Sequence, residues 1–347
     1  MMDQDWIPSR KWTSNWLHSN GDDHSVSVGA TDEVATIYNQ AGDEYVSYAD
    51  GDPSQPFAFD GLHAYADRCV WAALEEKLTD LQTKGASSIR FLDAGCGPGT
   101  WLRRLVLRAR ALGFNNITAR GFDIAEGQIE RARLAARNLS ALPGVSLTFD
   151  VADLTDRLPE SDASVDLTIC LYSALSHLPV ATLKGASTEI ARVTSGYFIT
   201  TVRPVGSTPT AFVDSVENVR RLKLDHARDR CEIDLSDGRR LAFGFHLFTA
   251  VELRNHFAGY FDVEDLRGLD LFHCRFTPDT RWNPVRSLGG GSLADELERL
   301  EKTFTRRPEF INRAAHLMLV GSRRQAAAPI AGVVAPADAG DFPNHLP

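Results

Sequence analysis

The stretch Ile89-Arg90-Phe91-Leu92-Asp93-Ala94-Gly95-Cys96-Gly97-Pro98-Gly99-Thr100 decides the fold of this chain. Its first four residues are mostly apolar and predict a strand, and the glycines that follow predict a sharp turn. A helix comes next, because apolar residues share one helical face before Gly113 ends it: Leu102, Leu105, Val106, Ala109 and Leu112. A strand, a glycine-rich turn and a helix in this order predict the first unit of a doubly wound α/β sheet.

The alternation of short apolar segments and amphipathic segments continues along the chain to residue 203. Strands are predicted over 117–122, 145–149, 165–171 and 197–202, and helices over 126–139 and 181–193. The pattern breaks after Arg203, because Pro204 has no backbone N–H with which to continue a sheet.

An insertion follows, in which two apolar segments flank Asp237-Gly238, a pair that favours a tight hairpin turn. Thr249 and Glu252 then form a capping box that predicts the start of a helix. The remaining predicted elements are a helix over 251–257, a strand over 261–271, a helix over 293–304 and a last strand over 316–320.

These patterns divide the chain into four parts. Both ends lack periodicity and predict mobile tails, whereas the helical spacing of apolar residues around Ala64 to Leu81 predicts a helical cap. The predicted parts are an N-terminal tail (1–33), the helical cap (34–85), a main domain (86–322) with a core over 88–203 and the insertion over about 204–247, and a C-terminal tail (323–347).

Composition and charge exclude several classes of protein. The 347 residues carry a net charge of −9, the wrong sign for a surface that tracks nucleic-acid phosphates, so we expect no nucleic-acid partner. No apolar stretch is long enough for a membrane span, and no signal peptide begins the chain, so we expect a cytoplasmic protein without a membrane partner. The five cysteines are scattered without a Cys-x-x-Cys pair and predict free thiols rather than a metal site.

The glycine-rich turn carries the strongest chemical signal. Its Gly-x-Gly-x-Gly spacing differs from the Gly-x-Gly-x-x-Gly with which dinucleotide-binding folds hold a pyrophosphate. Asp93 precedes the first glycine, and its carboxylate would repel a pyrophosphate but suits a ligand that carries an ammonium group.

These motifs resemble those of the class I S-adenosylmethionine-dependent methyltransferases, closely over residues 88 to 203 and more loosely beyond. The resemblance implies a Rossmann-like, mostly parallel sheet of seven strands with an antiparallel last strand. It also implies that S-adenosylmethionine is the methyl donor. The residues that it assigns to the cofactor are Asp93, Gly95, Gly97 and Gly99 for the amino-acid part, Asp123 for the ribose hydroxyls, and Ile124, Asp153 and Leu154 for the adenine.

Two of these acids have structural alternatives. Asp123 could instead cap a helix, since aspartate is favoured at helix starts. Asp153 could cap a turn ahead of Leu158-Pro159. The functional interpretation rests on both acids standing at successive strand ends together with the glycine turn.

The acceptor side is predicted at the loop from Leu171 to Pro179, because ligands of open α/β sheets bind outside the carboxyl ends of the strands. Leu171 is assigned to the cofactor pocket. Tyr172 either lines the pocket or packs. His177 is the candidate general base or substrate hydrogen-bonding group, and the alternative is a histidine that orders the loop.

Further contacts come from outside this loop. Tyr38 and Tyr45 lie in a segment similar to the one that closes over the cofactor in many family members, so Tyr38 is assigned to the cofactor and Tyr45 to the substrate. Arg203 is a candidate clamp for a substrate carboxylate, or else an ordinary surface ion pair. We expect no metal, because the catechol-type enzymes hold theirs with acids at strand ends, where this chain has Cys170.

Motifs of the macromolecular methyltransferases are missing from this loop, and the insertion is similar to lids of small-molecule enzymes. The sequence therefore predicts methylation of a small molecule at an oxygen, a nitrogen or a thioether sulfur by in-line displacement. The alternatives are a cofactor-binding regulatory or assembly protein without methyl transfer, or a tRNA or protein methyltransferase. A homodimer is one alternative for the oligomeric state.

Overall fold

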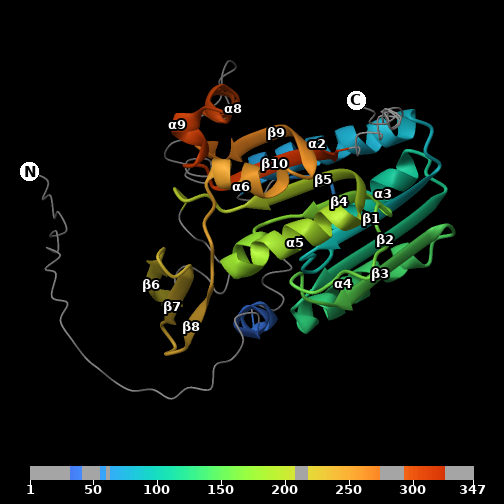
Figure 1. The fold of residues 1–347 in the computed structure, drawn as a ribbon. Coiled ribbons are helices and arrows are strands. Elements are labelled where there is room, and N and C mark those ends of the chain that lie inside the picture. The colour runs from blue at the N-terminus through green and yellow to red at the C-terminus, as the bar shows by residue number, and fades with distance from the viewer. Residues whose placement is uncertain (1–31, 41–54, 60–62, 208–217, 274–292, 325–347) are drawn as a thin grey trace, which may run out of the picture.

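The computed structural model describes residues 32–40, 55–59, 63–207, 218–273 and 293–324. A seven-stranded sheet, in the order β3-β2-β1-β4-β5-β10-β9, forms the centre of the molecule (Figure 1). Neighbouring strands from β3 to β5 run parallel, whereas β10 is antiparallel to both β5 and β9. This confirms the predicted Rossmann-like sheet with its antiparallel last strand.

The first half of the sheet follows the predicted alternation, with boundaries shifted by a few residues. Its elements are β1 (Ser88–Ala94), α3 (Thr100–Ala111), β2 (Asn116–Asp123), α4 (Glu126–Ser140), β3 (Val145–Val151), β4 (Val165–Cys170), the 3-10 turn η1 (Ala174–His177), α5 (Val180–Val193) and β5 (Thr194–Val202). Chain order and sheet order reverse between β1 and β4, which separates their adjoining loops and opens a crevice at the carboxyl ends of these strands.

The second half adds β6 (Val219–Asp225), β7 (Arg230–Leu235), β8 (Arg240–Gly244), α6 (Ala250–Phe257), β9 (Phe261–Leu269), α8 (Leu293–Phe304), α9 (Pro308–Ile311) and β10 (His316–Arg323). The predicted hairpin is β7–β8, and β6 pairs with it to form a separate three-stranded antiparallel sheet that the sequence did not predict. The capping box is confirmed, because Thr249 Oγ1 accepts the Glu252 amide and the Glu252 carboxylate accepts the Thr249 amide.

Two buried layers hold the helices on the central sheet. The side chains of α2 (Ala64–Thr83), α3 and α4 pack on one face, and those of α5 and α6 pack on the other. Fully burying one large apolar side chain contributes about 1.5–3 kcal/mol, so these two layers fix the strand ends rigidly.

The predicted tails fall almost entirely outside the described residues. The described part of the chain begins with a helix over residues 32–40, which includes the last two residues of the predicted N-terminal tail. At the other end β10 runs to Arg323, one residue beyond the predicted end of the main domain. Among the described residues, no helix is both long and apolar enough to cross a membrane.

Candidate active site

The glycine-rich turn connects β1 to α3 in backbone conformations that favour glycine. Gly95 has a φ of +76°, and a side chain there would collide with Ala174 of η1. Gly99, with a φ of +74°, forms the N-cap of α3, where a Cβ would lie 2.6 Å from the Phe149 ring. A side chain at either position would collide with protein atoms, so glycine lets the turn pack closely here. Gly95 and Gly97 present backbone to the adjoining pocket near the helix N-terminus, and we call this part of the turn the glycine cradle.

Asp123, the last residue of β2, faces this cradle. One of its carboxylate oxygens accepts the Gly97 amide at 2.9 Å, and the other accepts the Ala125 amide at 2.9 Å. Asp123 therefore ties the glycine turn to Ala125, the N-cap residue of α4, without itself capping the helix, and it also lines the adjoining pocket.

Asp93 lies beneath the glycine turn rather than in the pocket wall. Its side chain is 2% exposed, and it is not among the pocket-lining residues. Burial, and secondarily the nearby charge of Asp123, raise the pKa of Asp93 to about 8. A cation held by the turn would relieve this electrostatic cost, because it would favour the ionised carboxylate.

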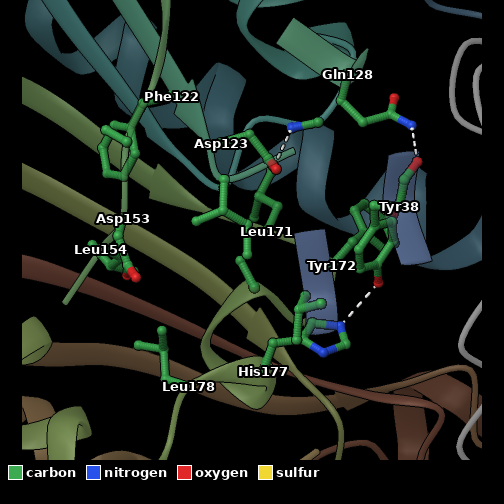
Figure 2. A pocket seen from close by; sticks show the side chains of 16 residues that line it. Tyr38, Phe122, Asp123, Gln128, Asp153, Leu154, Leu171, Tyr172, His177 and Leu178 are labelled. Atoms are coloured by element: carbon green, nitrogen blue, oxygen red, sulfur yellow. Dashed lines mark hydrogen bonds between the residues drawn. The ribbon is translucent and has the colours of Figure 1, made fainter. Parts of the chain in front are cut away.

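A pocket opens at the carboxyl ends of β1, β2 and β4 and contains about 740 Å³ of space not occupied by protein atoms, part of it open to solvent. Figure 2 shows Phe122, Asp153 and Leu154 on one side of it and Tyr38, Tyr172 and His177 on the other. Ten of the predicted site residues line it: Tyr38, Gly95, Gly97, Asp123, Ile124, Asp153, Leu154, Leu171, Tyr172 and His177.

Other predicted residues lie elsewhere. Gly99 stands at the helix start, and Tyr45 lies outside the described residues. Arg203 is 6% exposed, and its guanidinium donates to the backbone oxygen of Ala315 at 3.0 Å. Burial on this scale contradicts the alternative of an ordinary surface ion pair for Arg203.

Asp153 lies in the pocket wall and also closes a turn. It lines the pocket, and one of its carboxylate oxygens accepts the Thr155 amide at 2.8 Å, which closes a turn. A hydrogen bond to its own turn fixes the side chain without using up the second oxygen, so the turn and a ligand contact are compatible.

The loop after β4 makes a strained bend that exposes its side chains to the pocket. Tyr172 and Ser173 have φ values of +50° and +76°, which non-glycine residues rarely adopt. The Tyr172 amide is held by Thr201 Oγ1 at 2.6 Å, and its hydroxyl donates to the Asp67 carboxylate of α2. The bend thus places the Tyr172 ring at the wall of the pocket.

Both ring nitrogens of His177 are engaged. Nε2 and the Tyr38 hydroxyl are 2.9 Å apart, and Nδ1 and the Gly244 backbone oxygen are 3.3 Å apart (Figure 2). A neutral ring that donates from Nδ1 to the carbonyl and accepts the hydroxyl at Nε2 satisfies both contacts. Burial lowers the pKa of His177 to about 4, so the ring is neutral near pH 7 and a weak base.

Helix 32–40 contributes Val34 and Tyr38 to the pocket lining and packs against the three-stranded sheet, which is distant in the sequence. Val34 and Ile37 of helix 32–40 pack into an apolar cluster with the inner face of the three-stranded sheet β6–β8. Glu33 and Arg230 join the same two elements by a bidentate ion pair, with distances of 3.0 and 3.1 Å. We call helix 32–40 and β6–β8 together the lid.

Sequence reasoning missed several lining residues, namely Val34, Phe122, Gln128, Ala152, Ala174 and Leu178. Gln128 is the most informative, because it is a polar side chain that is 1% exposed on α4. Its side-chain amide donates to the backbone oxygen of Tyr38 at 2.8 Å and so anchors the lid. A glutamine among the apolar positions of the α4 inner face was the available signal.

The family model described as "Methyltransferase domain" matches residues 91–196. These residues run from β1 through the glycine turn, Asp123 and the β4 loop into β5, so they include most of the pocket-lining residues. The chain carries a class I methyltransferase domain. Among curated proteins, none matches it in sequence.

Several solved structures resemble this chain. Magnesium protoporphyrin IX methyltransferase from Synechocystis PCC 6803 with bound S-adenosylmethionine is 14% identical, with a TM-score of 0.48, over 86% of this chain and 100% of that one. Geranyl diphosphate C-methyltransferase from Streptomyces coelicolor A3(2) is 17% identical, with a TM-score of 0.44, over 86% and 100%. The [4+2]-cyclase SpnF is 17% identical, with a TM-score of 0.48, over 86% and 98%. Such low values say nothing about the acceptor of this chain.

The donor of this domain class is S-adenosylmethionine, and the residues of the pocket fit it. The open glycine cradle and the buried Asp93 suit a group that carries an ammonium, and Asp123 presents a carboxylate at a strand end, where hydroxyl groups can be held. Ile124 and Leu154 add apolar surface for a flat ring.

Proposed function

We propose that this protein transfers a methyl group from S-adenosylmethionine to a small-molecule acceptor. The observation that carries the proposal is a pocket at the strand ends that the lid covers, with Tyr38 and Val34 of helix 32–40 among its lining residues. A pocket covered by helix 32–40 suits a small molecule, whereas a nucleic acid or protein acceptor would need an open approach to the methyl group.

In this proposal the residues divide the pocket into a donor end and an acceptor end. Gly95 and Gly97 present backbone to the amino-acid part of the cofactor, and Asp93 contributes its charge from beneath the turn. Asp123 holds the ribose hydroxyls. Ile124, Asp153, Leu154 and Leu171 contact the remaining nucleoside, and the bound cofactor supplies a methyl group already activated on a sulfonium.

Tyr172 and His177 line the acceptor end. We assign His177 to a positioning role, because its two nitrogens hold Tyr38 of the lid and Gly244 at the end of β8. A ring with a pKa of about 4 is a poor acceptor for a proton from an alcohol. Positioning and exclusion of water by the closed lid are then the main contributions of the chain to an in-line displacement. Arg203 and Tyr45 remain proposed acceptor contacts.

The first test is calorimetric titration of the full chain with S-adenosylmethionine, S-adenosylhomocysteine and NAD. We expect the first two to bind and NAD not to bind; binding of NAD alone would refute the cofactor assignment. A panel of hydroxyl, amine and thioether acceptors, with tRNA and protein substrates as comparison, then tests methyl transfer. Cofactor binding without transfer to any acceptor of the panel would favour the regulatory alternative.

A further inference from the structure

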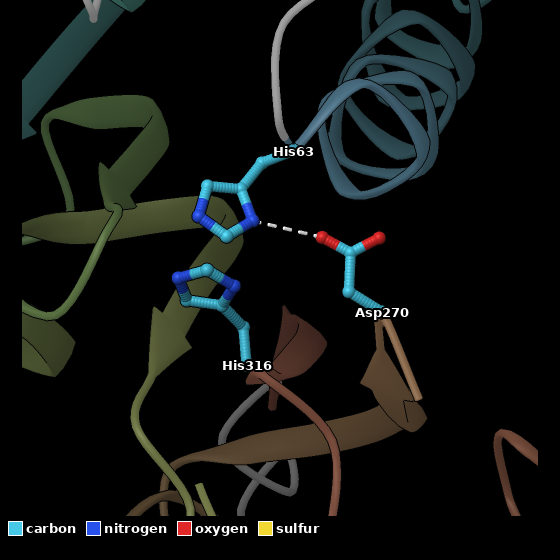
Figure 3. A group of neighbouring side chains, drawn as sticks. All are labelled: His63, Asp270 and His316. Atoms are coloured by element: carbon cyan, nitrogen blue, oxygen red, sulfur yellow. Dashed lines mark hydrogen bonds and ion pairs between the residues drawn. The ribbon is translucent and has the colours of Figure 1, made fainter. Parts of the chain in front are cut away.

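Three side chains with metal-ligating atoms meet beside Tyr172. His63, Asp270 and His316 each offer one ligand atom, and these atoms all lie within 4.8 Å of one another (Figure 3). They are 8%, 0% and 1% exposed, respectively. A search of the described part of the chain finds only this group of three or more such side chains.

The sheet brings these residues together at the edge where the cofactor pocket opens. Asp270 directly follows β9, and His316 begins β10, where it pairs with Leu269. Because β10 is antiparallel to β5 and β9, its first residue lies beside the last residues of both, at the carboxyl end of the parallel strands. His63 is the N-cap residue of α2 and approaches from above this edge.

The separation of the ligand atoms matches a shared metal ion. His63 Nδ1 and Asp270 Oδ2 are 2.9 Å apart. Two ligands at bond lengths of about 2.0–2.1 Å from one ion lie about 3 Å apart, so the pair has a suitable spacing without rearrangement. The same distance also fits a hydrogen bond, so the pair alone does not distinguish a hydrogen bond from a metal site. The third side chain decides between the two.

His316 supplies that third group. Its Nδ1 is sealed from solvent and has no hydrogen-bond partner. Its ring lies 5.0 Å from the His63 ring, centroid to centroid, at 81°. Buried ring nitrogens are normally hydrogen-bonded or metal-bound, so the unpaired Nδ1 of His316 beside a histidine–carboxylate pair indicates a missing ligand.

Backbone strain points to the same site. Asp270 has a φ of +59°, which a non-glycine residue rarely adopts. Such conformations cost of order 1–3 kcal/mol and cluster at ligand sites. Here the strained backbone turns the carboxylate toward His63 (Figure 3).

We propose that His63, Asp270 and His316 bind one divalent transition-metal ion at the acceptor side of the methyltransferase pocket. Two imidazoles and one carboxylate suit zinc or iron better than calcium or magnesium, whose preferred ligands are oxygens. The site differs from the sequence-based expectation of no metal.

Three protein ligands leave coordination positions open, as in catalytic rather than structural sites. Tyr172 separates the cluster from the cofactor: its ring lies 5.3 Å from that of His316, and it lines the pocket. An acceptor hydroxyl that coordinates the ion would lose its proton more easily. His177, as a weak base, does not assist this deprotonation. This use of the ion rests on the proposed function, whereas metal binding itself does not.

The test is direct metal binding by the full chain after removal of metals with EDTA. Calorimetric titration with Zn²⁺, and Co²⁺ as a spectroscopic probe, should give one equivalent per chain. His316→Ala and Asp270→Asn should each weaken binding by at least about 100-fold, because outer-shell changes alone cost 10- to 100-fold. The matched control is His226→Ala, an exposed histidine outside the cluster, which should bind like the parent.

Misfolding of a variant is controlled by thermal unfolding without metal and by cofactor titration, since none of the three residues lines the cofactor pocket. Zn²⁺ should raise the midpoint of the parent and of His226→Ala but not that of the two cluster variants. No binding by the parent, or equal binding by parent and cluster variants, would overturn the site. Zn²⁺ binding without S-adenosylmethionine binding would refute the proposed function and leave the metal site standing.

Discussion

Replacing Asp123 by alanine tests the donor end of the pocket most sharply. In the proposed complex its carboxylate holds the ribose hydroxyls of the cofactor. A hydrogen bond to a charged group contributes about 1.5–3 kcal/mol, so the loss of one such contact raises Kd by about 10- to 150-fold. Calorimetric titration of Asp123→Ala with S-adenosylmethionine at 25 °C measures this change against the parent.

The structure also predicts a stability cost for the same variant. The carboxylate of Asp123 accepts the amides of Gly97 and Ala125, at 2.9 Å each, and alanine leaves both donors without it. An unsatisfied buried donor costs about 1–3 kcal/mol, which urea unfolding measures. Asp123→Asn keeps one oxygen acceptor and should be more stable than Asp123→Ala while still binding the cofactor more weakly than the parent.

A matched control lies on the neighbouring strand. Asp150 of β3 forms an ion pair with Arg120 at 2.8 Å, and its side chain is 48% exposed. Asp150→Ala should cost at most about 1 kcal/mol and leave cofactor affinity unchanged. A folded Asp123→Ala protein that binds S-adenosylmethionine as tightly as the parent would refute the assignment of this strand end.

Three further predictions concern the same pocket. Gly95→Ala should destabilise the fold by at least about 1–2 kcal/mol, because φ is +76° and the new side chain meets Ala174; an unchanged urea midpoint would contradict this. Asp93 has a pKa of about 8 in the folded protein and near 4 in the unfolded chain, so at pH values between these only the native state holds the proton. The cofactor-free protein should therefore lose stability as the pH rises from 4 to 8, and Asp93→Asn should flatten that profile. His177 has a pKa of about 4 in the folded protein, so on acidification the unfolded chain binds a proton at this residue before the folded protein does. Stability should therefore fall as the pH drops from 6.5 toward 4. A His177→Gln variant whose stability depends on acid pH in the same way as that of the parent would contradict this prediction.

The donor end of the pocket could be predicted from the sequence because its signals are local. The glycine turn lies between a strand and a helix whose periodicities are unmistakable, and Asp123 and Asp153 follow the ends of the next two strands. Parallel strands bring their carboxyl ends to one edge, so strand order along the chain was enough to place these residues in one pocket. The capping box at Thr249 was predictable for the same reason.

The sequence did not predict that Asp93 is buried away from the pocket wall. The alternation of side chains along β1 does not show which of them faces a ligand. The third strand of the insertion also escaped prediction. The residues of β6 are half-buried or exposed, and Val219 and Leu224 are the ones that pack against the buried cluster, so its sequence gives a weak strand signal. Pairing with β7 forms it, and that contact is tertiary.

The sequence by itself determined the sheet, the glycine cradle and the methyltransferase class, since each depends on residues that are neighbours along the chain. Only the tertiary structure decided what surrounds the acceptor. It joined helix 32–40 to β6–β8, engaged both nitrogens of His177 and brought His63 to Asp270, 207 positions away. Such contacts depend on the register of β9 and β10 and on the packing of α2, which no local periodicity encodes.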